Sequence, residues 1–456
     1  MARSARPRYR AWVRIMMLFS LFGLLLCASS ARSHLEPQYG KHPFDDGQTT
    51  WGGYTSWGLV LPDDEQPGHF LRVCEQALSP AQGYFGHALG DGRILLGRIG
   101  GVSAGEPVPS GLVTTSDGGC TYDALNNELS GKFPSAFWAD PSDPLHLMIG
   151  TSTSQVANGI WESFDGGATF VSVLSEGQRD FFQLTRDGGR VAVSGSGRDG
   201  SGSVVLLVSE DGGASFIDVS AAVSDYAVVR ALSFDDEGLL LGGFLIDGST
   251  GVERLVGVEA PAREFVGALP SEATHAVSFG GAIYAVVSRR STQPGVYRRG
   301  SGNADFVHLT GTMPTACLFV AADGSHLVGC GEQAGLNQAL FLTSADGLAW
   351  ETAIRFSDVD YRVCPQGTIG NAACAAYFEQ LCHDGLDNDL DGETDCGDDD
   401  CAENAVCQGE GEGEGEGEGE GEGEGEPGDS CDCAGGSAAL LLPVLMLRRR
   451  RASSSR

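Results

Sequence analysis

The sequence predicts an all-β protein folded as a seven-bladed β-propeller, and three observations support this class. A turn of the form Ser/Thr-x-Asp-Gly-Gly-x-Thr/Ser, followed by an aromatic residue, recurs at spacings of 48 and 46 residues. Before each turn lie three short runs rich in aliphatic and aromatic residues, which indicates four antiparallel strands per repeat. No helical period of comparable length occurs between residues 48 and 363. Four-stranded units of roughly 40 to 50 residues in series are typical of a propeller.

The first 31 residues have the pattern of a secretory signal peptide. Five arginines precede an apolar run from Ile15 to Leu26, and small residues follow up to Ala31. Cys27 raises the alternative of a lipoprotein, but Leu26 stands where lipid-attachment signals carry a small residue. We therefore expect cleavage after Ala31 and an exported protein.

Seven repeats can be placed within residues 48–365. The three full copies of the turn are TSDGGCTY, SFDGGATF and SEDGGASF, and SADGLAW follows about three periods later. Weaker copies end at Phe70, Phe265 and Phe306. We expect the aromatic residue of each turn to pack between neighbouring sheets. The second strand of each later repeat is expected at an aliphatic run, beginning at Arg93, Leu145, Arg190, Gly238, Ala282 and His326.

The two ends of the propeller are expected to meet in blade one. TTWGGYTSWGLVLP supplies only a second and a third strand before the turn that ends at Phe70, so the first repeat lacks an inner strand. DVDYRVC, from Asp358 to Cys364, follows the last repeat without a repeat of its own. We expect this C-terminal strand to fill the innermost position of blade one and to close the ring.

The recurring turns have a structural explanation. Gly166 and Gly167 permit positive φ, the carboxylate of Asp165 can accept hydrogen bonds from turn amides, and Thr169 can add a hydroxyl contact. The pattern resembles the Asp-box, or BNR, repeat found in propellers of sialidases, xyloglucan-active glycosidases and sortilin-type receptors. That resemblance implies a position away from the substrate face. We therefore expect a structural role for the four aspartates, Asp117, Asp165, Asp211 and Asp346, whose turns are called the aspartate turns below.

The cysteine count favours disulfides. Thirteen cysteines are present, and ten remain without Cys27, Cys431 and Cys433, an even set in an exported chain. A two-residue hairpin turn at Asp323-Gly324 places Cys317 opposite Cys330, within disulfide reach. A pair of buried free thiols is the alternative. Cys74 and Cys120 are candidates for a link between neighbouring blades, which their spacing alone does not decide.

Residues 374–407 predict a small disulfide-rich Ca²⁺-binding motif. The acidic residues have the oxygen-ligand spacing of a calcium loop, around a turn at Gly392. The pattern resembles thrombospondin type 3 repeats and a cysteine-rich metal-binding motif of exported myxobacterial proteins, with Asp rather than Glu at the last position. The alternative is a solvated acidic linker held by disulfides. The candidate Ca²⁺ ligands are Asp387, Asp389, Asp391, Glu393, Asp395 and Asp398.

The last fifty residues predict a linker and an attachment signal. Residues 408–430 contain a strict Gly-Glu alternation, which cannot form a core and is expected to be disordered and extended. In residues 431–456, Cys431 and Cys433 precede a short apolar run and four arginines, which resembles the MYXO-CTERM sorting signal of myxobacterial surface proteins. Fourteen helical residues would reach about 21 Å, short of a bilayer of roughly 30 Å. A plain C-terminal membrane anchor is the alternative.

The net charge and the sequence motifs restrict the classes of function that this protein can have. The net charge of -32 repels phosphate backbones, so nucleic acid is excluded as a partner, and the membrane is reached only through the C-terminal signal. We predict a cell-surface (outer membrane-attached) or secreted binding protein whose variable loops bind an extracellular glycan or protein. The alternatives are an Asp-box glycoside hydrolase, for which Asp140, Asp235 and Asp236 are candidate acids, and a purely structural spacer.

Overall fold

The structure of the 456-residue chain is a computed structural model. The chain divides into two compact units, residues 1–408 and 409–456, and every described residue belongs to the first. The structure describes residues 40–45, 50–56, 58–63, 66–78, 83–103, 106–153, 157–198, 202–287, 291–302, 305–311, 314, 316–331, 338–362, 364–374, 395–397, 401 and 407.

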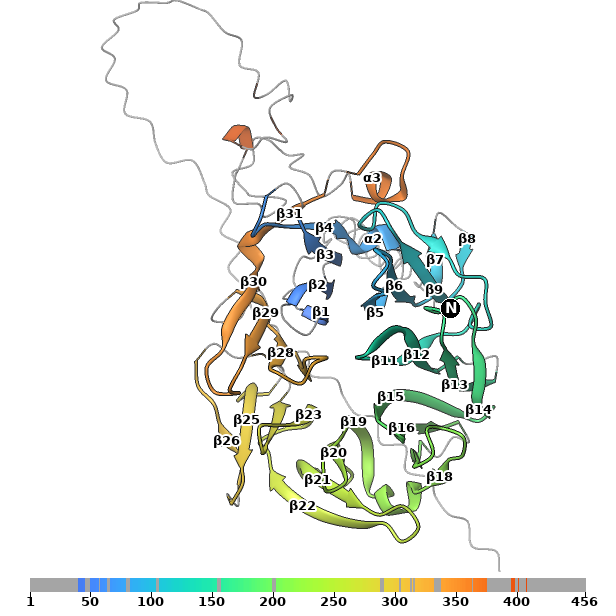
Figure 1. Ribbon diagram of the computed structural model, residues 1–456, viewed down its shortest axis with the longest axis vertical. Helices are drawn as coiled ribbons and strands as arrows, with labels where there is room; N and C mark the ends of the chain where they lie inside the picture. Colours follow the sequence, from blue (N-terminus) through green and yellow to red (C-terminus); the bar gives the residue numbers. More distant parts are fainter. Residues whose placement is uncertain are drawn as a thin grey trace, which may run out of the picture. The chain divides into compact units, whose positions relative to one another are not determined.

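Seven antiparallel sheets follow one another around a ring, which confirms the predicted propeller (Figure 1). From the centre outward, blade one contains β1 (Gly40–Asp45), β2 (Thr50–Thr55), β3 (Gly58–Pro62) and β4 (Phe70–Cys74). Blade two contains β5 (Gly83–Ala88), β6 (Ile94–Arg98), β9 (Gly111–Thr115) and β10 (Asp123–Ala124). Blade three contains β11 (Pro134–Asp140), β12 (Asp143–Thr151), β13 (Asn158–Ser163) and β14 (Val171–Glu176).

The remaining blades have the same order. Blade four contains β15 (Arg179–Asp187), β16 (Arg190–Gly197), β17 (Val204–Ser209) and β18 (Ile217–Asp218). Blade five contains β19 (Tyr226–Phe234), β20 (Leu239–Leu245), β21 (Thr250–Val256) and β22 (Ala262–Ala268). Blade six contains β23 (Ala273–Phe279), β24 (Ala282–Val287), β25 (Gly295–Gly300) and β26 (Val307–His308). Blade seven contains β27 (Cys317–Val320), β28 (Leu327–Cys330), β29 (Ala339–Ser344) and β30 (Glu351–Arg355).

Within the described ranges, only short elements lie outside these sheets. A separate hairpin of β7 (Gly101–Ser103) and β8 (Glu106–Val108) is inserted between β6 and β9. The helical segments are α2 (Glu75–Leu78), η1 (Ser220–Val223), η2 (Phe356–Asp358), α3 (Ile369–Cys374) and η3 (Asp395–Gly397). Among the residues that the structure describes, no helix has the length and apolar character needed to cross a bilayer.

The hydrophobic core lies between the blades, because successive side chains of a strand face opposite sides of its sheet. On β12, Leu147 and Ile149 pack with leucines of blade two, whereas Met148 between them packs with Val191 and Val193 of blade four. Each blade therefore contributes to two separate interfaces. The six predicted aliphatic runs become the second strands β6, β12, β16, β20, β24 and β28.

The aromatic residue after each turn packs toward the preceding blade in most repeats, but not in blade five. Phe170 of blade three is buried among blade-two leucines, and Phe216 of blade four packs against Met148 of blade three. Phe265, expected to play this part in blade five, is 67% exposed. Its segment, GVEAPAREF, has no Asp-Gly pair, and Phe265 lies within β22.

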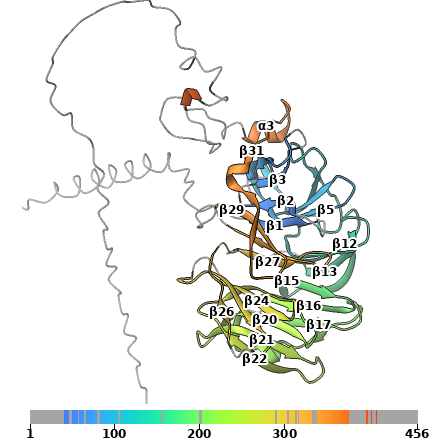
Figure 2. The same cartoon turned by 60° about the vertical axis from the view of Figure 1, so that its left-hand side comes forward.

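The position predicted for the C-terminal strand in blade one is wrong. This strand, β31 (Val359–Tyr361), does join blade one, but it runs parallel to β4 at the outer edge. The innermost strand is instead β1, which precedes the expected start of the repeats and pairs antiparallel with β2. Figures 1 and 2 both place β31 and the following α3 beside blade one.

Candidate functional site

The strand connections define two faces of the propeller. The turns between first and second strands and the aspartate turns lie on one face, called the turn face. The connections from second to third strands and from fourth strands to the next blade lie on the other, called the loop face.

Each aspartate turn joins the third and fourth strands of its blade through its own carboxylate. In blade three, Oδ1 of Asp165 accepts hydrogen bonds from Ser163 Oγ (2.8 Å) and Thr169 N (2.9 Å), and Oδ2 accepts one from Thr169 Oγ1 (2.6 Å). Asp117 and Asp211 have the same contacts. Asp346 lacks the hydroxyl at the fourth position and accepts from the amides of Leu348 and Ala349 instead.

These contacts keep the carboxylates ionised. Hydrogen bonds from the side chain and amide of Ser215, and from Ser209, lower the pKa of Asp211 to about 2. Burial acts to raise the pKa of Asp165, but hydrogen bonds from Thr169 and Ser163 outweigh it and hold the pKa below its usual value. All four aspartates are thus occupied within their turns, and none has the free carboxyl group that acid–base chemistry needs.

The turns also connect neighbouring blades. Gly167 has a φ of +87°, and a Cβ there would lie 3.6 Å from Leu95 of blade two. Asn127 Nδ2 of blade two donates to the Gly167 carbonyl at 2.6 Å, and the amide of Phe170 donates to Glu128 at 2.9 Å. The distance of 3.6 Å is an ordinary van der Waals contact, so the second glycine is required by its positive φ and not by lack of space.

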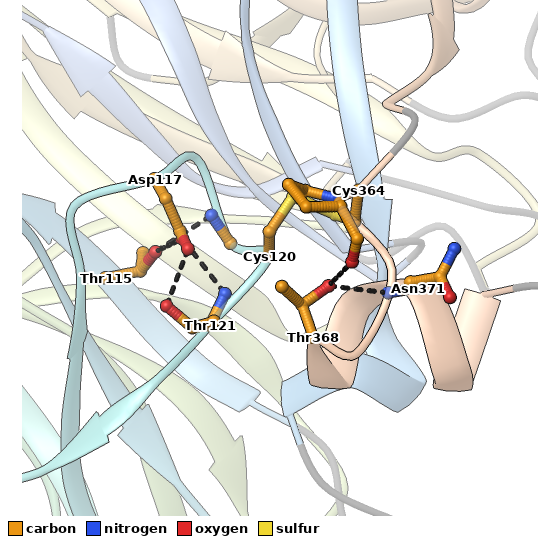
Figure 3. Close-up of a disulfide and its surroundings, with 9 residues drawn as sticks. Thr115, Asp117, Cys120, Thr121, Cys364, Thr368 and Asn371 are labelled. Carbon is orange, nitrogen blue, oxygen red and sulfur yellow. Dashed lines mark hydrogen bonds between the residues drawn. A yellow bond between two sulfur atoms is a disulfide. The ribbon is translucent and has the colours of Figure 1, made fainter.

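Three disulfides are described. Cys317 and Cys330 are cross-strand partners on β27 and β28 and are bonded, with Cα atoms 4.8 Å apart. The candidate link between Cys74 and Cys120 is wrong, because Cys120 is bonded to Cys364, 244 positions away (Figure 3). The third disulfide joins Cys396 and Cys407 in the Asp-rich segment.

The predicted Ca²⁺ ligands are not placed by the structure. Asp387, Asp389, Asp391, Glu393 and Asp398 lie outside the described residues, and only the backbone of Asp395, at the start of η3, is described. The signal peptide, the Gly-Glu linker and the C-terminal signal also lie outside the described residues.

Two of the candidate acids of a hydrolase are structural residues of the turn face. Asp140 accepts hydrogen bonds from the amide and hydroxyl of Ser142 and contacts Nδ1 of His146 at 3.1 Å. Burial acts to raise the pKa of Asp140, but the hydrogen bonds from Ser142 and His146 outweigh it and lower the pKa.

Asp235 caps its turn through the amides of Glu237 and Gly238, and its other oxygen contacts Arg254 at 2.6 Å. Its side chain is 5% exposed. Asp236 is adjacent in the same turn.

An arc of aromatic rings lines the inner edge of the ring, which the sequence did not predict. The five rings belong to the innermost strands of blades two, three, one, seven and six, and they are, in this order, His87, Phe137, His42, Phe319 and His275. The centres of successive rings lie 5.5, 5.5, 5.6 and 5.3 Å apart. Among the described residues, no group of histidines, cysteines or acids is placed to hold a metal ion.

The histidines of this arc are held neutral. Burial lowers the pKa of His42 to about 4, and the neighbouring His87 adds to this effect. Burial also lowers the pKa of His275 to about 4 and that of His87 below its usual value, although His87 donates to the Pro144 carbonyl. Nδ1 of His42 is buried and has no hydrogen-bond partner within the described part of the chain. The 45-residue separation of His42 and His87, one repeat, was the signal that could have located the arc.

On the loop face lies the half-buried Arg98, which forms no ion pair with an acid among the residues that the structure describes. Arg98 ends β6 at the root of the β7–β8 hairpin, and its cross-strand neighbours are glycines, Gly83 on β5 and Gly111 on β9. Its Nε is buried without a hydrogen-bond partner among the described residues, and burial lowers its pKa. At the other end of the same strand, Arg93 is ion-paired with Asp91 at 2.7 Å.

Comparisons with known proteins give the chain distant structural neighbours. A GH74 xyloglucanase from Xanthomonas campestris is 15% identical over 70% of this chain and 56% of that chain, with a TM-score of 0.43. Prolyl endopeptidases are 12% identical over 75% and 53% (TM-score 0.45), and a chain of a nidogen/laminin complex is 12% identical over 56% and 87% (TM-score 0.37). No protein-family model and no curated protein matches the sequence. These likenesses assign neither a family nor an activity.

Proposed function

We propose that this protein is an exported, non-enzymatic binding protein, attached to the cell surface or released after processing. The loop face of its propeller binds an extracellular glycan or protein. The variable loops on this face stand on a rigid scaffold, the arrangement in which recognition is usually found.

Arg98 is the observation that carries the proposal. A guanidinium that has lost part of its hydration is stabilised by a paired acid. In a chain with a net charge of -32, acids are abundant, yet none of the described ones pairs with Arg98. A carboxylate or another anionic group on a ligand is the partner that such a site favours, since arginine binds carboxylates in bidentate geometry.

A glycoside hydrolase is the weaker candidate. Hydrolysis requires two carboxyl groups facing one substrate, about 5 to 9 Å apart. Asp140 and Asp235 are both committed to turns and ion pairs, and they lie on the face opposite Arg98. The resemblance of the aspartate turns to the Asp-box repeat concerns structural residues and supplies no catalytic group.

The Asp-rich segment is a Ca²⁺-binding spacer in this proposal. Its oxygen-rich residues hold the ion, its disulfides restrain the loop, and the Gly-Glu linker separates the propeller from the attachment signal. Support comes from ligand spacing, because hard oxygen donors around a glycine turn suit Ca²⁺.

The binding proposal can be tested on an array of neutral glycans, acidic glycans and acidic peptides. The full exported chain should be retained on acidic ligands, and no reducing ends should be released. Arg98→Ala should weaken retention by about tenfold or more, as expected for the loss of a charge-assisted pair. Arg93→Ala, which removes the same charge from the other end of β6, should not. Equal effects of the two variants, no retention, or turnover of a glycan would overturn the proposal.

A further inference from the structure

Blade one combines strands from both ends of the propeller in one sheet. Its strands β1 to β4 come from one stretch near the N-terminus, and the C-terminal β31 is added outside them. The seam between blades seven and one is hydrophobic, with Val60 of blade one packed against Phe341 and Ile354 of blade seven. Among the described strands, β31 alone adds backbone pairing between the C-terminal end of the propeller and blade one.

A short segment crosses the outer edge of blade one, from blade seven toward blade two. This segment, called the strap, is β31 with Arg362 and Cys364. It pairs with Phe70, Leu71 and Arg72 of β4, and the Arg362 amide donates to the Arg72 carbonyl at 2.9 Å. The Tyr361 ring covers the buried Arg72, whose guanidinium carbon lies 3.6 Å from the ring centre.

The end of the strap is fixed to blade two. Cys364 is bonded to Cys120, which lies in the aspartate turn of that blade (Figure 3). Beyond the disulfide the chain turns into α3, where the Gly370 amide donates to the Cys120 carbonyl at 2.9 Å. Cys120 and Cys364 are 2% and 4% exposed, so a reductant reaches the sulfurs only when the strap lifts.

We propose that the strap, locked by the Cys120–Cys364 disulfide, retains blade one in the ring, and that reduction of this bond releases blade one as a unit. A dithiol reductant transfers two electrons and two protons to the bond. The products are thiols on Cys120 and Cys364 and the cyclic disulfide of the reductant. The closed ring therefore requires an oxidising compartment, in agreement with export.

Hydrogen exchange followed by mass spectrometry tests the proposal on the full chain. In the double variant Cys120→Ala/Cys364→Ala, peptides from β1 to β4 should exchange about 30-fold faster or more, the change that corresponds to about 2 kcal/mol. Peptides from β15 to β22, on the far side of the ring, should keep their wild-type rates. Wild-type protein in a dithiol reductant should show the same pattern after a delay.

Cys317→Ala/Cys330→Ala is the matched control, because it removes a disulfide within one blade. It should change exchange in blade seven only. If the strap variant does not fold, Tyr361→Ala tests the same contact with the disulfide intact and should loosen β1 to β4 selectively. Equal acceleration in all seven blades, or no acceleration in blade one, would overturn the proposal.

Discussion

The imidazole of His42 on blade one lies 5.6 Å from the ring of Phe319 on blade seven, so the first and last blades meet through an uncharged aromatic contact. Phe137 of blade three lies on the other side of His42 at 5.5 Å. Protonation would place a charge in this arc beside His87 and His275, and no carboxylate contributes to the pKa of His42.

We expect the free energy of unfolding to decrease as the pH falls from 6.5 to about 4. The pKa values of His42 and His275 are about 4 in the folded protein and 6.5 for an unperturbed histidine. As the pH falls, the unfolded chain therefore binds protons at these histidines before the folded protein does. Their contribution is complete above pH 6.5 and is lost as the pH falls through the folded pKa. It is on the order of 3 kcal/mol for each histidine. Denaturant unfolding at several pH values across this range measures the free energy of unfolding. His42→Gln should flatten the profile of unfolding free energy against pH. An equally steep profile in this variant would contradict the assignment of the pH dependence to the histidines of the arc. His308→Gln, which replaces an exposed histidine, is the control.

Loss of one aspartate turn should destabilise the protein measurably. Asp211→Ala removes the acceptor for Ser209 Oγ, Ser215 N and Ser215 Oγ. Removing partners of several hydrogen bonds should lower the melting temperature by roughly 2–4 °C in calorimetry. Glu210→Ala removes the neighbouring exposed carboxylate and should leave the melting temperature unchanged. Equal shifts would show that charge, and not the turn, is responsible.

Gly53 should not tolerate a methyl group. A Cβ at this position would lie 2.4 Å from the Phe341 ring, across the seam between blades one and seven. Overpacking of this kind costs about 1–3 kcal/mol. Gly53→Ala should lose this much stability in urea unfolding. Gly177→Ala, where nothing lies within 4 Å of the added carbon, is the control and should change stability little.

Calcium binding should depend on the Asp-rich segment. In the full chain, Asp389→Ala/Asp391→Ala should abolish the heat of Ca²⁺ binding in titration calorimetry, because both residues are predicted oxygen ligands. Glu412→Gln/Glu414→Gln removes the same charge from the linker and should retain the heat. An unchanged heat in the aspartate variant would reject the ligand assignment.

The sequence predicted the blades well because each repeat contains its own strand and turn signals. Asp-Gly-Gly turns and aliphatic runs are local patterns, and all six expected second strands form. The strands of blade one were harder to predict from the sequence. GKHPFD, which forms β1, contains a proline and charged residues and resembles no strand in isolation. Its pairing with β2 is decided by tertiary contacts, which override local propensity.

Long-range partners were predicted less well than local ones. The Cys317–Cys330 pair follows from a single hairpin, and the turn contacts of Asp165 follow from seven consecutive residues. The bond between Cys120 and Cys364 depends on where β31 lies in space, and the arc depends on which inner strands face one another. Neither relation has a local signal. Arg98 also required the structure, because the lack of an acidic partner among the described residues can be recognised only from their positions in space.

The β7–β8 hairpin has a consequence for the evolution of this protein. It is inserted after Arg98, yet β6 and β9 pair in unbroken register from Ile94 with Thr115 to Arg98 with Gly111. An insertion at this point leaves the rest of the blade unchanged. The same connection in other blades is therefore a site where segments can be inserted during evolution while the four strands of the blade are kept.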